Sequence, residues 1–176
     1  MTYATLREAN IARHAEWTNN QLVELTWRGT ELAGEIGEVI ELFVNLGEPG
    51  GNFSVDIQNE CADSWICLDL TAMTLGFDPF PYNSLAIAGR LGSWDNTGAK
   101  LGALTGRICN QLKKLEREKR GWPGSKGSMQ ALNFDMLYLA AMLNRISADC
   151  HFLLEEAVRN KFNATSEKVG LKTRLG

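Results

Sequence analysis

The chain has 176 residues, of which 44% are hydrophobic and 22% charged, and its formal net charge at pH 7 is −3. This composition is typical of a globular protein of one domain, and the small negative charge argues against a broad basic surface for nucleic acid or anionic membranes. No apolar run reaches the roughly 18 residues of a membrane span, and the first residues lack the features of a secretion signal. We therefore expect a cytoplasmic protein that binds neither nucleic acid nor membrane.

Apolar residues recur at helical spacing along most of the chain, and no stretch shows a competing strand period. We expect an all-α helical bundle with helices at about 5–15, 19 or 20–46, 54–75, 83–90, 97–119, 129–148 and 152–162. Thr18 and Gln21 form a capping box before the second helix, and the loop GEPGGN ends it. Ser54 caps the third helix, and Gly76 stands where that helix would end in the left-handed conformation.

Two parts of the sequence resemble one another. ELAGEIGEVIELFVNL aligns with KLGALTGRICNQLKKL, and WICLDLTAMTLGFDPF aligns less well with LYLAAMLNRISADCHF. The second copy has Leu104 and Arg107 where the first has Glu35 and Glu38. The pattern indicates two degenerate helical repeats, although amphipathic helices alone could produce such a match.

We therefore expect one domain over residues 1–176. Its metal-binding half would span about 20–92, and its degenerate structural half about 97–171. Four cysteines are spread along the chain without a CxxC pair: Cys61, Cys67, Cys109 and Cys150. Because close Cys/His pairs are lacking, these are expected to be buried free thiols and not a zinc site.

Two short clusters each carry a pair of carboxylates, Glu35 and Glu38 in GEIGEVIE, and Glu60 and Asp63 in NECADSWI. The i, i+3 spacing puts both members of a pair on one helical face, one turn apart. Two such helices packed face to face would gather four negative groups, which repel one another unless cations lie between them. Oxygen ligands favour Mg²⁺ or Mn²⁺, so we expect these four residues to hold two or more such ions.

The carboxylates have two other interpretations, a solvated helical face and a di-iron site. A solvated face usually carries i, i+4 lysine partners, which are few here, and the second pair lies in an apolar helix beside Trp65 and Ile66. A di-iron site needs Glu-x-x-His on two helices, and neither His14 nor His151 follows a glutamate by three residues. Both patterns favour the magnesium or manganese site.

The two clusters resemble a known family. GEIGEVIE, the 22-residue interval from Glu38 to Glu60 and ECADSWICLDLTAMTLGFD are similar to the ExxE…ExxD signature of the MazG-type all-α nucleoside triphosphate pyrophosphatases. EEAVRNKFNATSEKVGL resembles the phosphate-binding end of the same superfamily. The family's first cluster is commonly Glu-Glu-x-x-Glu, and here Gly34 takes the leading position. Glu31, one turn earlier, is a substitute ligand or a substrate-binding group.

The resemblance implies hydrolysis of a (d)NTP between the α and β phosphates, giving a monophosphate and pyrophosphate for nucleotide pool adjustment or house-cleaning. Such chemistry needs charge neutralisation and an activated water more than covalent catalysis. Glu35 or Glu38 is expected to accept the proton of the water. By resemblance, Lys161 and Asn163 contact the phosphates, although both could equally be surface residues of a terminal helix.

The preferred base is less well defined by the sequence. Trp27 shares the helical stripe of Glu31 and lies roughly 12 Å along the axis from Glu35, so it could stack on a base or pack in the core. Asn20 and its neighbours offer amide edges that donate and accept together. Members of the superfamily differ among dUTP, dCTP, dGTP and damaged nucleotides, and an aromatic platform with amides favours a purine such as dGTP.

Two other functions remain open at this level. A non-catalytic nucleotide- or metal-binding regulatory bundle would fit the same ligands, and a structural oligomer would explain the apolar stripes but not the acidic pairs. The complete ligand set favours the enzyme. Long amphipathic helices with short connections rarely bury all their apolar surface alone, so a homodimer or homotetramer is expected.

Overall fold

The computed structural model describes residues 1–45, 53–82 and 97–176 and confirms an all-α helical bundle. Within these residues the helices are α1 (Leu6–Thr18), α2 (Leu25–Val44), α3 (Phe53–Leu75), α5 (Thr97–Lys119), α6 (Met129–Asp149) and α7 (Leu154–Lys168). The helix expected near 83–90 and the GEPGGN loop lie outside the described residues. None of the described helices is both long enough and apolar enough to cross a membrane.

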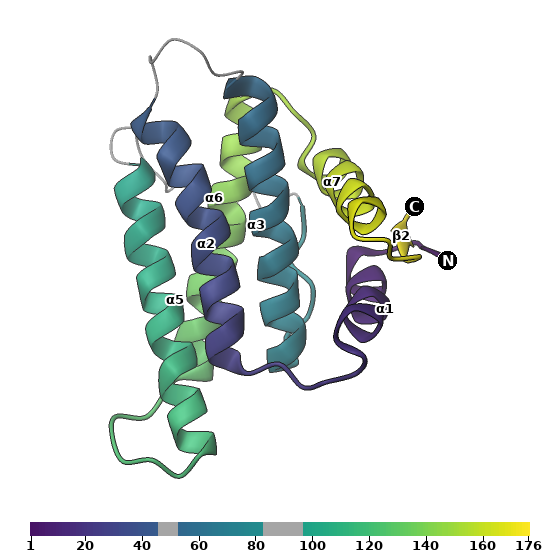
Figure 1. The fold of residues 1–176 in the computed structure, drawn as a ribbon. Coiled ribbons are helices and arrows are strands. Elements are labelled where there is room, and N and C mark those ends of the chain that lie inside the picture. Colours follow the sequence, from purple (N-terminus) through teal and green to yellow (C-terminus); the bar gives the residue numbers. More distant parts are fainter. Residues whose placement is uncertain (46–52, 83–96) are drawn as a thin grey trace.

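Four long helices form the bundle, with α2 packed against α3 and α5, and α6 packed against the same two helices. Figure 1 shows α1 and α7 on the outer side of α3, and both helices contact it. The carboxylate-bearing helices α2 and α3 are therefore direct neighbours. The acidic pairs of the sequence are brought onto facing helices, as expected.

The bundle core is built from apolar side chains at helical spacing, which turns one stripe of each helix inward. The largest fully buried side chains of the four long helices are Leu32, Ile36, Ile57, Leu68, Leu101, Leu104, Ile108, Leu112, Leu132, Met136 and Leu139. All four cysteines are free, and Cys61 is completely buried in this core. The expectation that the thiols are free is confirmed, but Cys67, Cys109 and Cys150 are only partly buried.

The boundary between α1 and α2 differs from the expectation. Asn19 and Asn20 both have left-handed backbone angles (φ 52° and 61°), which end α1, and α2 begins only at Leu25. The capping box predicted at Thr18 is therefore wrong. The structure has one at Thr5 instead, whose hydroxyl accepts from the Glu8 N–H while the Glu8 carboxylate accepts from the Thr5 N–H.

The end of α3 lies where the sequence predicts it, whereas the end of α7 does not. Gly76 adopts φ 73° and the Phe77 N–H donates to the Ala72 carbonyl over 2.9 Å, which confirms the predicted end of α3. The last helix was expected to stop at Phe162, but α7 continues to Lys168 before Gly170 turns with φ 76°. The polar residues after Phe162 are helical because that helix packs against α3.

Two very short strands, which the sequence did not predict, join the two ends of the chain. β1 (Thr2–Tyr3) pairs in parallel with β2 (Arg174–Leu175), and Figure 1 shows this pairing beside the ends of α1 and α7. The Gly176 N–H donates to the Tyr3 carbonyl over 2.8 Å and extends the pairing. The strands thus hold α1 and α7 together.

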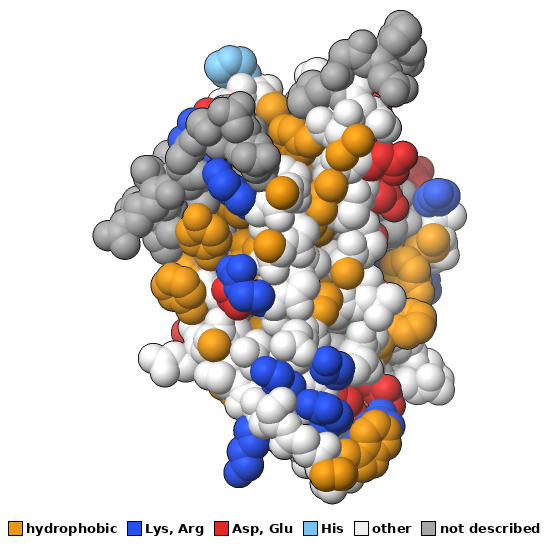
Figure 2. All heavy atoms as spheres, turned by 90° about the vertical axis from the view of Figure 1, so that its left-hand side faces the viewer, with side chains coloured by type: hydrophobic (Ala, Val, Ile, Leu, Met, Phe, Trp, Pro, Cys, Tyr) orange, Lys and Arg blue, Asp and Glu red, His pale blue; other side chains and the backbone are white. Residues whose placement is uncertain are grey.

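The side of the bundle formed by α5 lies away from α1 and α7 (Figure 1). Figure 2 shows the side on which α5 lies, with scattered apolar side chains and with Lys and Arg gathered toward its lower end. The exposed residues of α5 include Gly102, Ala103, Gly106 and Lys113. The carboxylate pairs are on α2 and α3 and not on α5.

Candidate metal and nucleotide site

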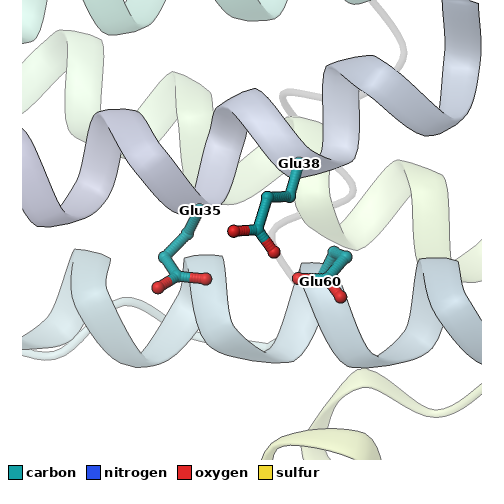
Figure 3. A group of neighbouring side chains, drawn as sticks. All are labelled: Glu35, Glu38 and Glu60. Carbon is teal, nitrogen blue, oxygen red and sulfur yellow. The ribbon is translucent and has the colours of Figure 1, made fainter.

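Three carboxylates meet between α2 and α3. One oxygen from each of Glu35, Glu38 and Glu60 lies within 4.8 Å of the others, so the three can hold one cation. In Figure 3, Glu35 and Glu38 extend from neighbouring turns of α2 toward α3, where Glu60 lies. We call these three residues the acidic triad. The i, i+3 spacing on α2 and the packing of α2 on α3 create it.

The environment of the acidic triad disfavours uncompensated negative charge. Burial, followed by the charges of Asp63 and Glu38, raises the pKa of Glu35 to about 7. Burial and the neighbouring Glu38 raise the pKa of Glu60 to about 7 as well. The Oε2 atom of Glu60 is buried and has no hydrogen-bond partner among the described residues. Because a buried polar atom needs a partner, a hard cation fits this oxygen donor set.

Asp63, the fourth predicted ligand, lies beside the acidic triad but is not a member of it. Its Oδ2 is 2.8 Å from Nζ of Lys161 on α7. Burial raises the pKa of Asp63, although the hydrogen bond and charge of Lys161 oppose this. Burial lowers the pKa of Lys161, but the hydrogen bond that Lys161 donates to Asp63, together with the charges of Asp63, Glu60 and Glu35, raises it overall. Lys161 is therefore paired with Asp63 beside the acidic triad, and its expected contact with the phosphates stays a prediction.

Asn163, two residues further along α7, does not reach the site. Its Nδ2 donates to the Leu175 carbonyl and its Oδ1 accepts from the Leu175 N–H, each over 2.8 Å. Both hydrogen-bonding ends of the amide are thus used to attach β2 to α7. The expectation that Asn163 contacts substrate is not supported by this position, because residues two apart on a helix face different directions.

A cleft of about 560 Å³ opens beside the acidic triad. Its volume lies within the range of about 300–1,000 Å³ typical of small-molecule sites. The lining residues come mainly from α1, the following loop, α2 and α3: Arg13, His14, Trp17, Thr18, Leu22, Val23, Glu24, Trp27, Arg28, Glu31, Glu35, Asp63, Ile66, Cys67, Leu70 and Thr165. Glu35 belongs to both the cleft and the acidic triad, so the two form one continuous site.

Two tryptophans line the cleft and remain open to solvent. Trp17 is 54% exposed and Trp27 is 59% exposed, so the alternative that Trp27 packs in the core is wrong. Such exposed aromatic faces are suited to stacking on a planar ring. Asn20, by contrast, is exposed in the loop after α1 and is not among the lining residues. The predicted amide edge is therefore not part of this cleft.

Arg13 is a cleft residue that the sequence analysis missed. It is only 6% exposed, and its guanidinium carbon lies 3.6 Å from the centre of the Phe162 ring. Among the described residues, its one hydrogen bond is from Nη1 to the Phe162 carbonyl over 3.3 Å. Burial lowers the pKa of Arg13 to about 10, so the group stays charged at neutral pH. Its remaining N–H donors make it an anion-binding group.

A second missed feature centres on Arg28, which is 3% exposed. Its Nη1 donates to Glu31 Oε2 over 2.7 Å, its Nη2 is 3.0 Å from His14 Nδ1, and its Nε donates to Thr74 over 3.2 Å. Burial and then the charge of Arg28 lower the pKa of His14. Arg28 thus holds a carboxylate and a neutral imidazole side by side on the wall of the cleft.

Comparison of the chain with models of protein families, with curated proteins and with solved structures found no match.

Proposed function

We propose that this protein is a metal-dependent nucleoside triphosphate pyrophosphohydrolase, which cleaves a (d)NTP to a monophosphate and pyrophosphate. The observation that carries this proposal is the continuity of the acidic triad with an aromatic-lined cleft of about 560 Å³. A nucleotide has the same two parts, a planar base and a polyphosphate that binds divalent cations. The resemblance of the carboxylate clusters to the MazG-type family supports the same reaction.

The acidic triad would hold Mg²⁺ or Mn²⁺, with Asp63 beside it as a further oxygen ligand. Bound there, the ions would supply positive charge opposite the phosphate oxygens and lower the pKa of water. The chain provides the negative charge for this from Glu35, Glu38 and Glu60. Lys161 and Arg13, both near Asp63, provide positive charge for the phosphates from the other side of the site.

Glu35 is suited to accept the proton of the attacking water. It lines the cleft and belongs to the acidic triad, so it lies between the place proposed for the ions and the place proposed for the nucleotide. In this step the water oxygen attacks the α phosphorus, the bond to the oxygen bridging the α and β phosphates breaks, and pyrophosphate leaves. Glu35 takes the proton released by the water.

The direct test is incubation of the purified protein with each NTP and dNTP in the presence of Mg²⁺ or Mn²⁺, with products resolved by ³¹P NMR. We expect a monophosphate and pyrophosphate. Release of inorganic phosphate and a diphosphate would contradict the assigned bond. Saturable nucleotide binding without turnover would instead favour a regulatory helix bundle and overturn the proposed enzymatic activity.

A further inference from the structure

The polar wall of the cleft has a defined hydrogen-bonding pattern. A guanidinium group can only donate hydrogen bonds, so the contact of Arg28 with His14 Nδ1 makes that nitrogen the acceptor. In a neutral imidazole the proton then lies on Nε2. Among the described residues, Nε2 of His14 has no partner, and the lowered pKa of this histidine keeps the ring neutral. His14 therefore offers one N–H donor to a ligand in the cleft.

Glu31 provides the complementary groups. Its Oε2 accepts from Arg28, while its Oε1 has no partner among the described residues. An ionised carboxylate has about four lone-pair sites and donates nothing, so Glu31 can accept two further N–H groups. His14 Nδ1 and Glu31 Oε2 bind two nitrogens of one guanidinium, so the imidazole and the carboxylate are neighbours on the wall of the cleft.

We infer that the cleft selects guanine, through Glu31 and His14 held in place by Arg28. This inference rests on the proposed nucleotide site and names its base. Guanine presents two adjacent donors, N1–H and the 2-amino group, beside the O6 acceptor. Glu31 accepts from both donors and His14 donates to O6, which gives three hydrogen bonds.

The other common bases match this wall less completely. Adenine and cytosine offer an amino group to Glu31 and a ring nitrogen to His14, and uracil and thymine offer one N–H and one carbonyl. Each of these makes two hydrogen bonds, one fewer than guanine. Loss of a hydrogen bond to a charged group weakens binding by about tenfold. Trp17 and Trp27 stack on any base and do not discriminate.

The test measures equilibrium binding of the 2′-deoxynucleoside monophosphates to the whole protein by titration calorimetry, without any need for turnover. We expect dGMP to bind about tenfold more tightly than dAMP, dCMP, dTMP or dUMP. The decisive probe is deoxyinosine monophosphate, which lacks only the 2-amino group. It is expected to bind the wild-type protein about tenfold more weakly than dGMP.

Two variants separate base selection from general loss of binding. In Glu31→Gln the amide has one acceptor oxygen, so dGMP and deoxyinosine monophosphate should bind almost equally. Trp27→Phe keeps an aromatic face and should weaken all bases alike, leaving their ratio unchanged. Circular dichroism confirms that each variant is folded.

Equal affinity for dGMP and deoxyinosine monophosphate in the wild type would overturn the inference, as would tighter binding of any other base. Failure to bind any monophosphate would overturn it too. Guanine-selective binding by a protein that cleaves no triphosphate would uphold this inference while the proposed hydrolysis failed. Cleavage of all triphosphates at equal kcat/KM, with no preference in binding, would support the proposed hydrolysis and overturn the inference of guanine selection.

Discussion

The two halves of the bundle carry different residue types at aligned positions. In α2 the positions of the first motif hold Glu35 and Glu38, whereas the aligned positions of α5 hold Leu104, which is 1% exposed, and Arg107. Extending the second alignment upstream places Leu132, 0% exposed, opposite Glu60.

The same extension places Asp135 opposite Asp63. Arg107 binds Asp135 over 2.9 Å between Nη2 and Oδ1, so the second half pairs its charges within the chain. In the first half Asp63 is likewise paired, with Lys161. Among the described residues no cation is bonded to Glu35, Glu38 or Glu60, and Glu35 and Glu60 have raised pKa values. Two helices of this bundle thus pack with Leu104 and Leu132 at the positions where α2 and α3 carry Glu35 and Glu60. The glutamates place partly buried negative charge between α2 and α3, which the proposed metal site would use.

The largest effect is expected from Glu38→Gln in the first half. The substitution keeps the shape of the side chain but removes one charge from the acidic triad, and kcat/KM for the triphosphate should fall about a thousandfold or more, as when a member of a catalytic unit is removed. Metal affinity, measured by calorimetry with Mn²⁺, should fall with it. Asp63→Asn should act in the same direction, and the circular dichroism of both variants should remain helical.

The matched control is Arg107→Gln, which changes the aligned position of the second half. It should leave kcat/KM within about twofold, because Arg107 pairs with Asp135 on α6 and shares no bonding partner with the acidic triad among the described residues. Unfolding of Glu38→Gln, or equal losses of activity in the two variants, would show that the carboxylates of α2 are structural.

The next effect concerns stability of the second half. Leu104→Ala removes a fully buried side chain and leaves a cavity, so the free energy of unfolding should fall by about 3 kcal/mol. Urea denaturation followed by circular dichroism measures this change. Mn²⁺ binding should be retained by the folded variant, since Leu104 is not in the acidic triad. A loss of metal binding without a loss of stability would contradict the assignment of this half as structural.

The smallest effect is the pH dependence of stability without metal. Glu35 and Glu60 have pKa values of about 7 in the folded protein and ordinary values near 4.5 when unfolded. The folded state therefore binds more protons at these two groups between these values, so their contribution to stability is fully present below pH 4.5 and is lost as pH rises through 7. Both groups are partly solvated, so after allowing for screening the loss should be about 1 kcal/mol.

Urea denaturation in EDTA at pH 5.5 and pH 8.0 measures this loss. Glu60→Gln should reduce the difference between the two pH values, because the amide does not titrate. Mn²⁺ added at pH 8.0 should restore stability by binding the deprotonated carboxylates. An identical pH dependence in wild type and Glu60→Gln would mean that Glu60 has an ordinary pKa.

Much of the fold and the centre of the site followed from local sequence spacing. Helical periodicity predicts α3, α5 and α6 closely, and the i, i+3 spacing predicts that Glu35 and Glu38 share a face. The α1–α2 boundary failed because the two left-handed asparagines, Asn19 and Asn20, compete with the capping box at Thr18. The residue types alone do not show whether Thr18 begins a helix or the asparagines after it end one.

The cleft residues could not be predicted, for a different reason. Arg13 and His14 on α1, and Arg28 on α2, acquire their roles only where separate helices meet. In the sequence each is a single polar residue in an amphipathic helix. For Asn163 the resemblance predicts a phosphate contact, but the amide makes hydrogen bonds to the backbone of Leu175 instead. The local sequence does not show this partner.

The pairing of β1 with β2 has a consequence for the motion of the cleft wall. Because the strands join the start of α1 to the end of α7, these two helix ends cannot separate without breaking the same backbone hydrogen bonds. Local opening of a protein proceeds in cooperative units, and these two helices should form one. Amide hydrogens of α1 and α7 should therefore exchange with deuterium at a common rate. Separation of β1 from β2, which lie outside the cleft, would set this rate.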